Sequence, residues 1–131
     1  QARLISRKPI IGIGQSAFHM AALRHGKFCV LTTLEVSVPV ITQNIKAQGF
    51  DNLCQDVVAS GIPVLELENN TGGAVNMLSE CIKTIEARDP DVAIVLGCAG
   101  MTKVCKKLQA QHNAYLLDPI VCSARMVNAV L

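Results

Sequence analysis

The sequence predicts an α/β fold in which a parallel sheet of about four strands has helices on both faces. Short aliphatic runs alternate with helical patterns along the chain, an order typical of parallel sheets. The run at residues 92–96 is apolar throughout, as expected for a strand that is covered on both sides. Half of the 131 residues are hydrophobic, which is enough for the core of one domain.

The first half of the chain is predicted to contain two strands and two helices. In chain order they are a strand at 9–13, a helix at 15–23, a strand at 27–33 and a helix at 38–48. Each helix is followed by a glycine, Gly26 or Gly49, which is a common residue at a helix end. Pro39 falls in the first turn of the second helix, where its missing N–H does no harm.

The second half continues the alternation. In chain order the predicted elements are a strand at 62–67, a helix at 72–87, a strand at 92–96, a helix at 102–109, a strand at 114–117 and a helix at 119–131. Pro63 lies near the start of its strand, where a missing donor is least harmful. Pro119 opens the last helix at a position that proline favours.

Charge and hydropathy exclude several classes of protein. The formal charge of +2 arises from interspersed Lys and Arg, so no basic block indicates nucleic acid or an anionic membrane. No apolar run approaches the roughly 18 residues of a spanning helix, and no signal-peptide pattern is visible. We expect a cytoplasmic chain that takes a small-molecule substrate and forms a homo-oligomer.

The six cysteines do not indicate a disulfide scaffold or a metal site. Disulfide scaffolds are small and poor in aliphatic core, whereas this chain is rich in it. The chain has no Cys-x-x-Cys pair, and its three histidines stand far apart, so no metal is expected. Cys81 and Cys105 fall on apolar helical stripes and are interpreted as packing residues.

Cys98 is the exception among the cysteines. It follows the apolar strand at 92–96, lies between Gly97 and Ala99, and precedes a helical segment. A thiol at a helix start lies near unpaired N–H groups and the positive end of the helix dipole, which favour the thiolate. We therefore interpret Cys98 as a reactive thiol, the alternative being an inert buried cysteine.

Thr32 and Thr33 are predicted to lie beside Cys98. In parallel sheets ligands bind beyond the carboxyl ends of the strands, where the strand order reverses. If the strand order is 2-1-3-4, the strand at 27–33 lies next to that at 92–96, and the two hydroxyls and the thiol share one crevice. Such groups suit a carboxylate, a carbonyl or an imide. Strand propensity and helix capping are the alternative reason for two threonines here.

Three blocks of the chain form a recognisable set: PIIGIGQSAFH at residues 9–19, GKFCVLTTL at 26–34 and IVLGCAGM at 94–101. Together they resemble the aspartate/glutamate/hydantoin racemase superfamily, most closely its hydantoin and allantoin racemase branch. The third block is the most specific, and the resemblance extends over nearly the whole chain. Asp118-Pro119 departs from that branch, which has a glycine after the aspartate, and the role of Asp118 is left open.

The resemblance implies a fold and a mechanism. Members of the superfamily have two similar flavodoxin-like lobes, each presenting one cysteine to a shared cleft, and use no cofactor. One thiolate removes the proton from the stereogenic carbon and the other thiol returns one to the opposite face. The residues implied to form the site here are Cys98 as one acid/base thiol, Ala99, Gly100 and Met101 as backbone donors, and Thr32, Thr33, Gln15 and Ser16 as substrate contacts.

The family's first cysteine has no match in these residues. It lies in a Cys-Phe-x-Asp-Pro-like segment upstream of the first block, and none of the other five cysteines corresponds to it. We therefore expect the chain to be the later part of a longer protein. Residues 1–16 are expected to be a remnant of the first lobe and the crossover, 17–118 the second lobe, and 119–131 a helix that returns toward the first lobe.

Three other interpretations remain open. Gly12 and Gly14 begin a Gly-x-Gly-x-x-Ala pattern, with Glu35 about 20 residues on, as in dinucleotide-binding modules. The arylmalonate decarboxylase branch of the superfamily uses a single cysteine in the second lobe, a role that Cys98 also fits. The third interpretation is an inactive relic in which Cys98 is retained only as a core residue.

Overall fold

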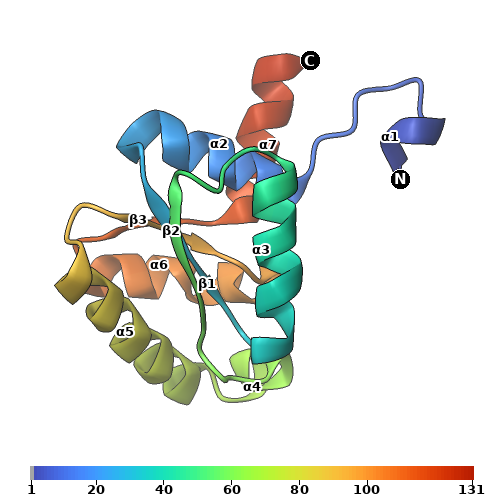
Figure 1. Cartoon of the computed structure of the whole chain (residues 1–131). Coiled ribbons are helices and arrows are strands. Elements are labelled where there is room, and N and C mark those ends of the chain that lie inside the picture. The colour runs from blue at the N-terminus through green and yellow to red at the C-terminus, as the bar shows by residue number, and fades with distance from the viewer. Residues whose placement is uncertain (1) are drawn as a thin grey trace.

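The computed structural model describes residues 2–131 and contains one four-stranded parallel sheet (Figure 1). Its strands are β1 (Phe28–Thr32), β2 (Cys54–Ala59), β3 (Ala93–Leu96) and β4 (Tyr115–Leu117). They lie in the order β2-β1-β3-β4, which confirms the predicted α/β class. This is the 2-1-3-4 order on which the expected proximity of Thr32 and Cys98 depends. The order reverses between β1 and β3, which is where the sequence places Thr32 and Cys98.

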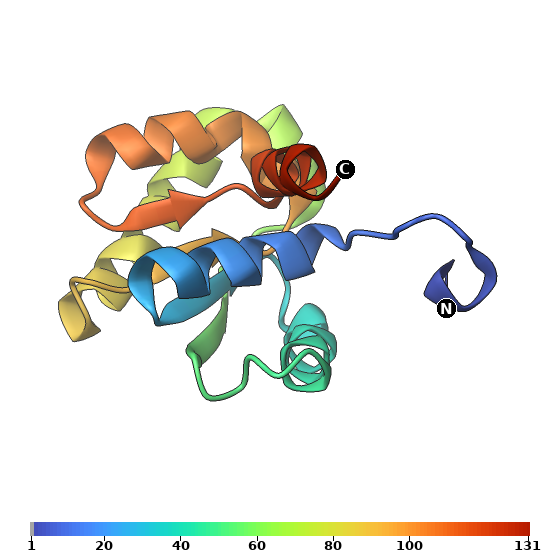
Figure 2. The ribbon, with the colours of Figure 1, turned by 90° about the horizontal axis from the view of Figure 1, so that it is seen from above.

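Helices surround the sheet (Figures 1 and 2). They are α1 (Ala2–Ile5), α2 (Ile13–His25), α3 (Val38–Ala47), α4 (Val64–Asn69), α5 (Thr71–Arg88), α6 (Thr102–Gln111) and α7 (Pro119–Val130), with 3₁₀ turns η1 (Glu35–Ser37) and η2 (Ala99–Met101). Gly26 and Gly49 follow α2 and α3 with φ of 74° and 77°, the left-handed backbone that glycine adopts without strain. Both predicted helix ends are therefore correct.

Successive residues of each inner strand point to opposite faces of the sheet, because the side-chain period of a strand is two. Cys29, Leu31 and Ile94 pack in one cluster with residues of α4, α5 and α6, here called the α5/α6 face. Phe28 and Val30 pack in a second cluster with residues of α2, α3 and α7, called the α2/α3 face. Both faces are covered, which explains why β1 and β3 are buried along their whole length.

The strand predicted at residues 9–13 is wrong. The chain at residues 9–12 is extended but pairs with no strand of the sheet, and α2 begins at Ile13. The apolar residues here lead into a helix and do not join the sheet. The prediction failed because a short aliphatic run has no periodicity that distinguishes a strand from the start of a helix. The dinucleotide-binding pattern at Gly12 and Gly14 therefore lacks the preceding strand that such modules require.

The strand predicted at residues 62–67 is also wrong. Pro63 caps a helix, α4, whose Leu67 is buried against the α5/α6 face. The strand that precedes this helix in the chain is β2, and it was not predicted from the sequence. This strand lies at the sheet edge and its side chains are mostly half-buried, so it has neither the apolar run of β3 nor a clear alternation.

Two leucines of α4 distinguish a helix from a strand in solution. Leu67 is 1% exposed and Leu65 is 69% exposed, whereas a strand would place residues two apart on the same face. We expect Leu67→Ala to lower the free energy of unfolding by about 2–5 kcal/mol and Leu65→Ala to change it by less than about 0.5 kcal/mol. Urea denaturation of both variants measures this; similar losses in the two would contradict the helix.

The two ends of the chain lie differently with respect to the sheet. The boundary expected between residues 16 and 17 falls inside α2, which is one continuous helix. The C-terminal α7 packs against α2, while α1 stands away from the body (Figure 2). Within residues 2–131, no helix is both long and apolar enough to cross a bilayer.

Candidate functional site

Cys98 lies directly after β3 at the switch in strand order. Its backbone is still extended (φ −134°, ψ 131°), and its thiol group is half-buried. The side chain is turned to the α5/α6 face, where it packs against that cluster. A Cβ atom on Gly100 would lie 3.6 Å from the Cys98 sulfur and 3.3 Å from Leu67 Cδ1, so the glycine leaves room beside the thiol.

The turn after Cys98 offers two free backbone donors. Residues Ala99–Met101 form η2, and α6 begins only at Thr102, so a short 3₁₀ turn separates the thiol from the longer helix. The Met101 N–H donates to the Cys98 carbonyl at 3.0 Å and is therefore occupied. The N–H groups of Ala99 and Gly100 have no acceptor among residues 2–131. Of the three predicted donors, these two remain free.

Gly97 brings β1 and the Cys98 turn into close contact. Its N–H donates to the Leu31 carbonyl at 2.7 Å, which extends the pairing of β1 and β3 by one residue. A Cβ atom at Gly97 would lie 3.0 Å from Val30 Cγ1 and 3.2 Å from Thr32 Cβ. Only glycine permits this approach. The structure thus places Thr32 beside the residue that precedes Cys98, as the predicted strand order implied.

Thr32 and Thr33 are buried at the end of β1. Their carbonyls accept hydrogen bonds from the N–H groups of Ser60 (2.9 Å) and Gly61 (2.7 Å), which fix the backbone of the strand end. Within the described part of the chain, neither threonine hydroxyl has a hydrogen-bond partner. Both hydroxyls therefore keep an unused capacity to form hydrogen bonds.

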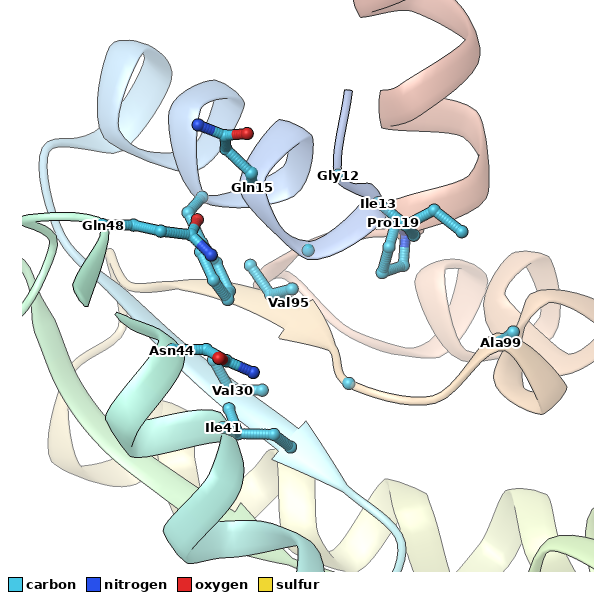
Figure 3. Close-up of a pocket in the computed structure, with 13 residues that line it drawn as sticks. Gly12, Ile13, Gln15, Val30, Ile41, Asn44, Gln48, Val95, Ala99 and Pro119 are labelled. Carbon is cyan, nitrogen blue, oxygen red and sulfur yellow. The ribbon is translucent and has the colours of Figure 1, made fainter. Parts of the chain in front are cut away.

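A cavity of about 230 Å³ opens on the α2/α3 face beside this turn (Figure 3). Figure 3 shows α2 and α3 on two sides, with Val30 and Val95 between them and Ala99 at one end. Gly97 and Ala99 line the cavity, while the side chain of the intervening Cys98 points to the other face. This separation follows from the alternation of side chains, which continues beyond the last residue of β3.

The two polar residues predicted near the start of α2 differ in their surroundings. Gln15 lines the cavity, and its side-chain carbonyl accepts a hydrogen bond from Arg3. Ser16 is buried, and its hydroxyl donates to the Gly12 carbonyl at 2.9 Å, which satisfies the first turn of α2. Ser16 therefore faces its own helix and lines a different, shallower pocket.

Two further residues, Asn44 of α3 and Gln48 at the C-terminal cap of α3, line the cavity with their carboxamides and were not predicted from the sequence. Both are exposed and one helical turn apart, so in the sequence they read as an ordinary polar helix face. No local pattern distinguishes them. Only the packing of α3 against the sheet, at β2, brings them to this cavity.

Asp118 ties the Cys98 turn to the last helix. It is buried at the end of β4, and its Oδ1 accepts a hydrogen bond from Thr102 Oγ1 at 3.2 Å and from the Ile120 N–H at 2.8 Å. The same carboxylate oxygen therefore anchors the first residue of α6 and caps α7. Pro119 fits this cap, since proline favours the first helical position.

Burial suppresses ionisation of the other thiols. It raises the pKa of Cys54 and Cys122 to about 11 and also raises the pKa of Cys29, Cys81 and Cys105. Such thiols carry little thiolate at neutral pH, which fits their interpretation as packing residues. Among residues 2–131, no three His, Cys, Asp or Glu side chains form a group that could hold a metal ion.

The chain matches the Asp/Glu/Hydantoin racemase family over residues 1–127. It is 37% identical to the hydantoin racemase of Rhizobium meliloti over 99% of its own length and 54% of that protein. The chain thus spans about half the length of the curated relatives that it resembles.

Two solved structures share the fold. The allantoin racemase from Klebsiella pneumoniae aligns with a TM-score of 0.85 and 31% identity over 98% of this chain and 53% of its own. The allantoin racemase from Pseudomonas fluorescens aligns with a TM-score of 0.87 and 26% identity over 93% of this chain and 52% of its own.

Proposed function

Because the chain belongs to the Asp/Glu/hydantoin racemase family, we propose that it forms part of a cofactor-independent racemase in which Cys98 is one of two acid/base thiols. The observation that carries the proposal is the Cys98 turn. There, a half-buried thiol, two free N–H groups and the end of β1 meet at the switch point of the sheet.

The proposed reaction inverts a carbon that bears a proton next to a carbonyl. The Cys98 thiolate removes this proton, and the electron pair moves onto the carbonyl oxygen to give an enolate. N–H groups of Ala99 and Gly100 and the hydroxyls of Thr32 and Thr33 supply hydrogen bonds for the ring oxygens. A thiol on the opposite face then donates a proton to the same carbon, which yields the other enantiomer.

The substrate class follows from the relatives. The curated relatives are named hydantoin racemases, and the structural neighbours are allantoin racemases. Both names denote a five-membered ring with alternating carbonyl and N–H groups. We therefore propose that the substrate has a hydantoin-like or allantoin-like ring. Backbone N–H groups and hydroxyls suit the neutral carbonyl groups of such a ring better than they suit a charged substrate.

The second thiol is proposed to come from a part of the protein outside these residues. An acid and a base must stand on opposite faces of one carbon, each within about 3 Å. The five other cysteines here are packing residues with raised pKa values. A second lobe is consistent with a chain that spans about half of its relatives.

The test uses the intact protein, as its gene encodes it, with each enantiomer of allantoin and of a 5-substituted hydantoin in heavy water. We expect loss of optical rotation with one deuterium incorporated at the stereogenic carbon per inversion. An arylmalonate decarboxylase would instead release carbon dioxide from a malonate and leave the rotation of both rings unchanged. The latter result would contradict racemisation.

A further inference from the structure

A second cluster of reactive side chains joins α5 to the residue that follows α6, and Cys98 is not part of it. Ser79 Oγ is 2.7 Å from His112 Nε2, and His112 Nδ1 is 3.1 Å from Glu86 Oε2. Ser79 and Glu86 stand two turns apart on α5, while His112 follows the end of α6. The imidazole is only 2% exposed, so its two partners hold it in one orientation.

Glu86 fixes the tautomer of His112. Burial opposes ionisation of Glu86, but hydrogen bonds from the Ala114 N–H, at 2.7 Å, and from His112 outweigh it and lower the pKa of the carboxyl group. A carboxylate can only accept, so His112 Nδ1 carries the proton that it donates to Glu86. His112 Nε2 is then the basic nitrogen, and the Ser79 hydroxyl donates to it.

This arrangement matches the nucleophile, base and orienting acid that activate a serine. The serine also borders open space: a cavity of about 420 Å³ is lined by Ser79 together with Asn76, Lys83 and Gln111. The carboxamides of Asn76 and Gln111 can donate N–H groups to an oxygen of a ligand held there. Nothing in the proposed racemisation uses any of these residues.

We propose that Ser79 is an activated nucleophile and that the cavity beside it takes small carboxylic esters. Ser79 Oγ forms a bond to the carbonyl carbon while its proton passes to His112 Nε2. The bond to the leaving alcohol then breaks, and His112 returns the proton to that oxygen. Water, deprotonated by His112, attacks the acyl group, and the carboxylic acid leaves with Ser79 restored.

The test treats the intact protein with a fluorophosphonate, which forms an Oγ–P bond with an activated serine and releases fluoride. Mass spectrometry is expected to locate the label on Ser79. His112→Gln is expected to lower the labelling rate by about 10²-fold or more and Glu86→Gln by a smaller factor. p-Nitrophenyl acetate should likewise acetylate Ser79.

Ser123 provides the matched control, since within residues 2–131 its hydroxyl bonds only to the Ile120 carbonyl. It should remain unlabelled, and Ser123→Ala should label at Ser79 like the unchanged protein.

Absence of label and acetyl group at Ser79 in the unchanged protein would overturn the proposal, and so would equal labelling of a folded His112→Gln or Glu86→Gln variant. Because labelling and acetylation of the unchanged protein are read out directly, a variant that fails to fold does not prevent the test. Ser79→Ala should still racemise hydantoins, so the two proposals fail independently.

Discussion

Replacing Cys98 by serine is expected to reduce racemisation of both enantiomers by about 10³-fold or more in the intact protein. Positioned acid/base groups typically contribute 10²–10⁴-fold. A serine hydroxyl is a far weaker acid than a thiol, so at neutral pH it offers almost no base for the ring proton. Polarimetry at several substrate concentrations separates the expected loss in kcat from any change in KM.

Deuterium exchange refines this expectation. If a second thiol faces the opposite side of the carbon, the Cys98→Ser variant should still exchange the proton of one enantiomer but not of the other. Cys105→Ser serves as the control: Cys105 packs against the α5/α6 face, and its substitution should change the melting temperature more than the turnover. Full racemase activity in Cys98→Ser would contradict the proposed role of this thiol.

Replacing Gly97 by alanine is expected to lower the free energy of unfolding by about 1–3 kcal/mol. The new Cβ would lie 3.0 Å from Val30 Cγ1, 3.2 Å from Thr32 Cβ and 3.4 Å from the Leu31 carbonyl. All three belong to β1, which is buried on both faces and cannot move away easily. Urea denaturation measures the loss.

Gly72 is the matched control for this change. It lies in the first turn of α5, and nothing stands within 4 Å of the position of an added Cβ. Because alanine favours a helix over glycine by up to about 1 kcal/mol, Gly72→Ala should leave stability unchanged or raise it. A Gly97→Ala protein as stable as this control would show that β1 and the Cys98 turn are less tightly packed than the geometry indicates.

Strong local signals predicted most of the fold. Residues 92–96 were recognisable as a strand because five consecutive aliphatic side chains need cover on both faces, and α3 because proline and glycine mark its ends. The weak signals failed. The short runs at 9–13 and 62–67 are apolar without a period, and the actual edge strand, β2, carries polar residues because solvent reaches it.

The site shows the same division. Cys98 and Thr32 were predicted from their places at strand ends, and the observed pairing of β1 with β3 brings these ends together. The position of Asn44 beside the cavity and the contact of Ser79 with His112 were not predictable, since each joins residues from separate elements. Ser79 and His112 are 33 positions apart in the chain.

By itself, the sequence determined the α/β class and the place of Cys98 after β3, because these follow from hydrophobic periodicity and from glycine at helix ends. Tertiary structure alone decided which way the thiol points, which backbone donors remain free and which polar groups meet at the second cluster. Those properties depend on side-chain direction and on distances between elements. A linear pattern restricts such distances but cannot fix them.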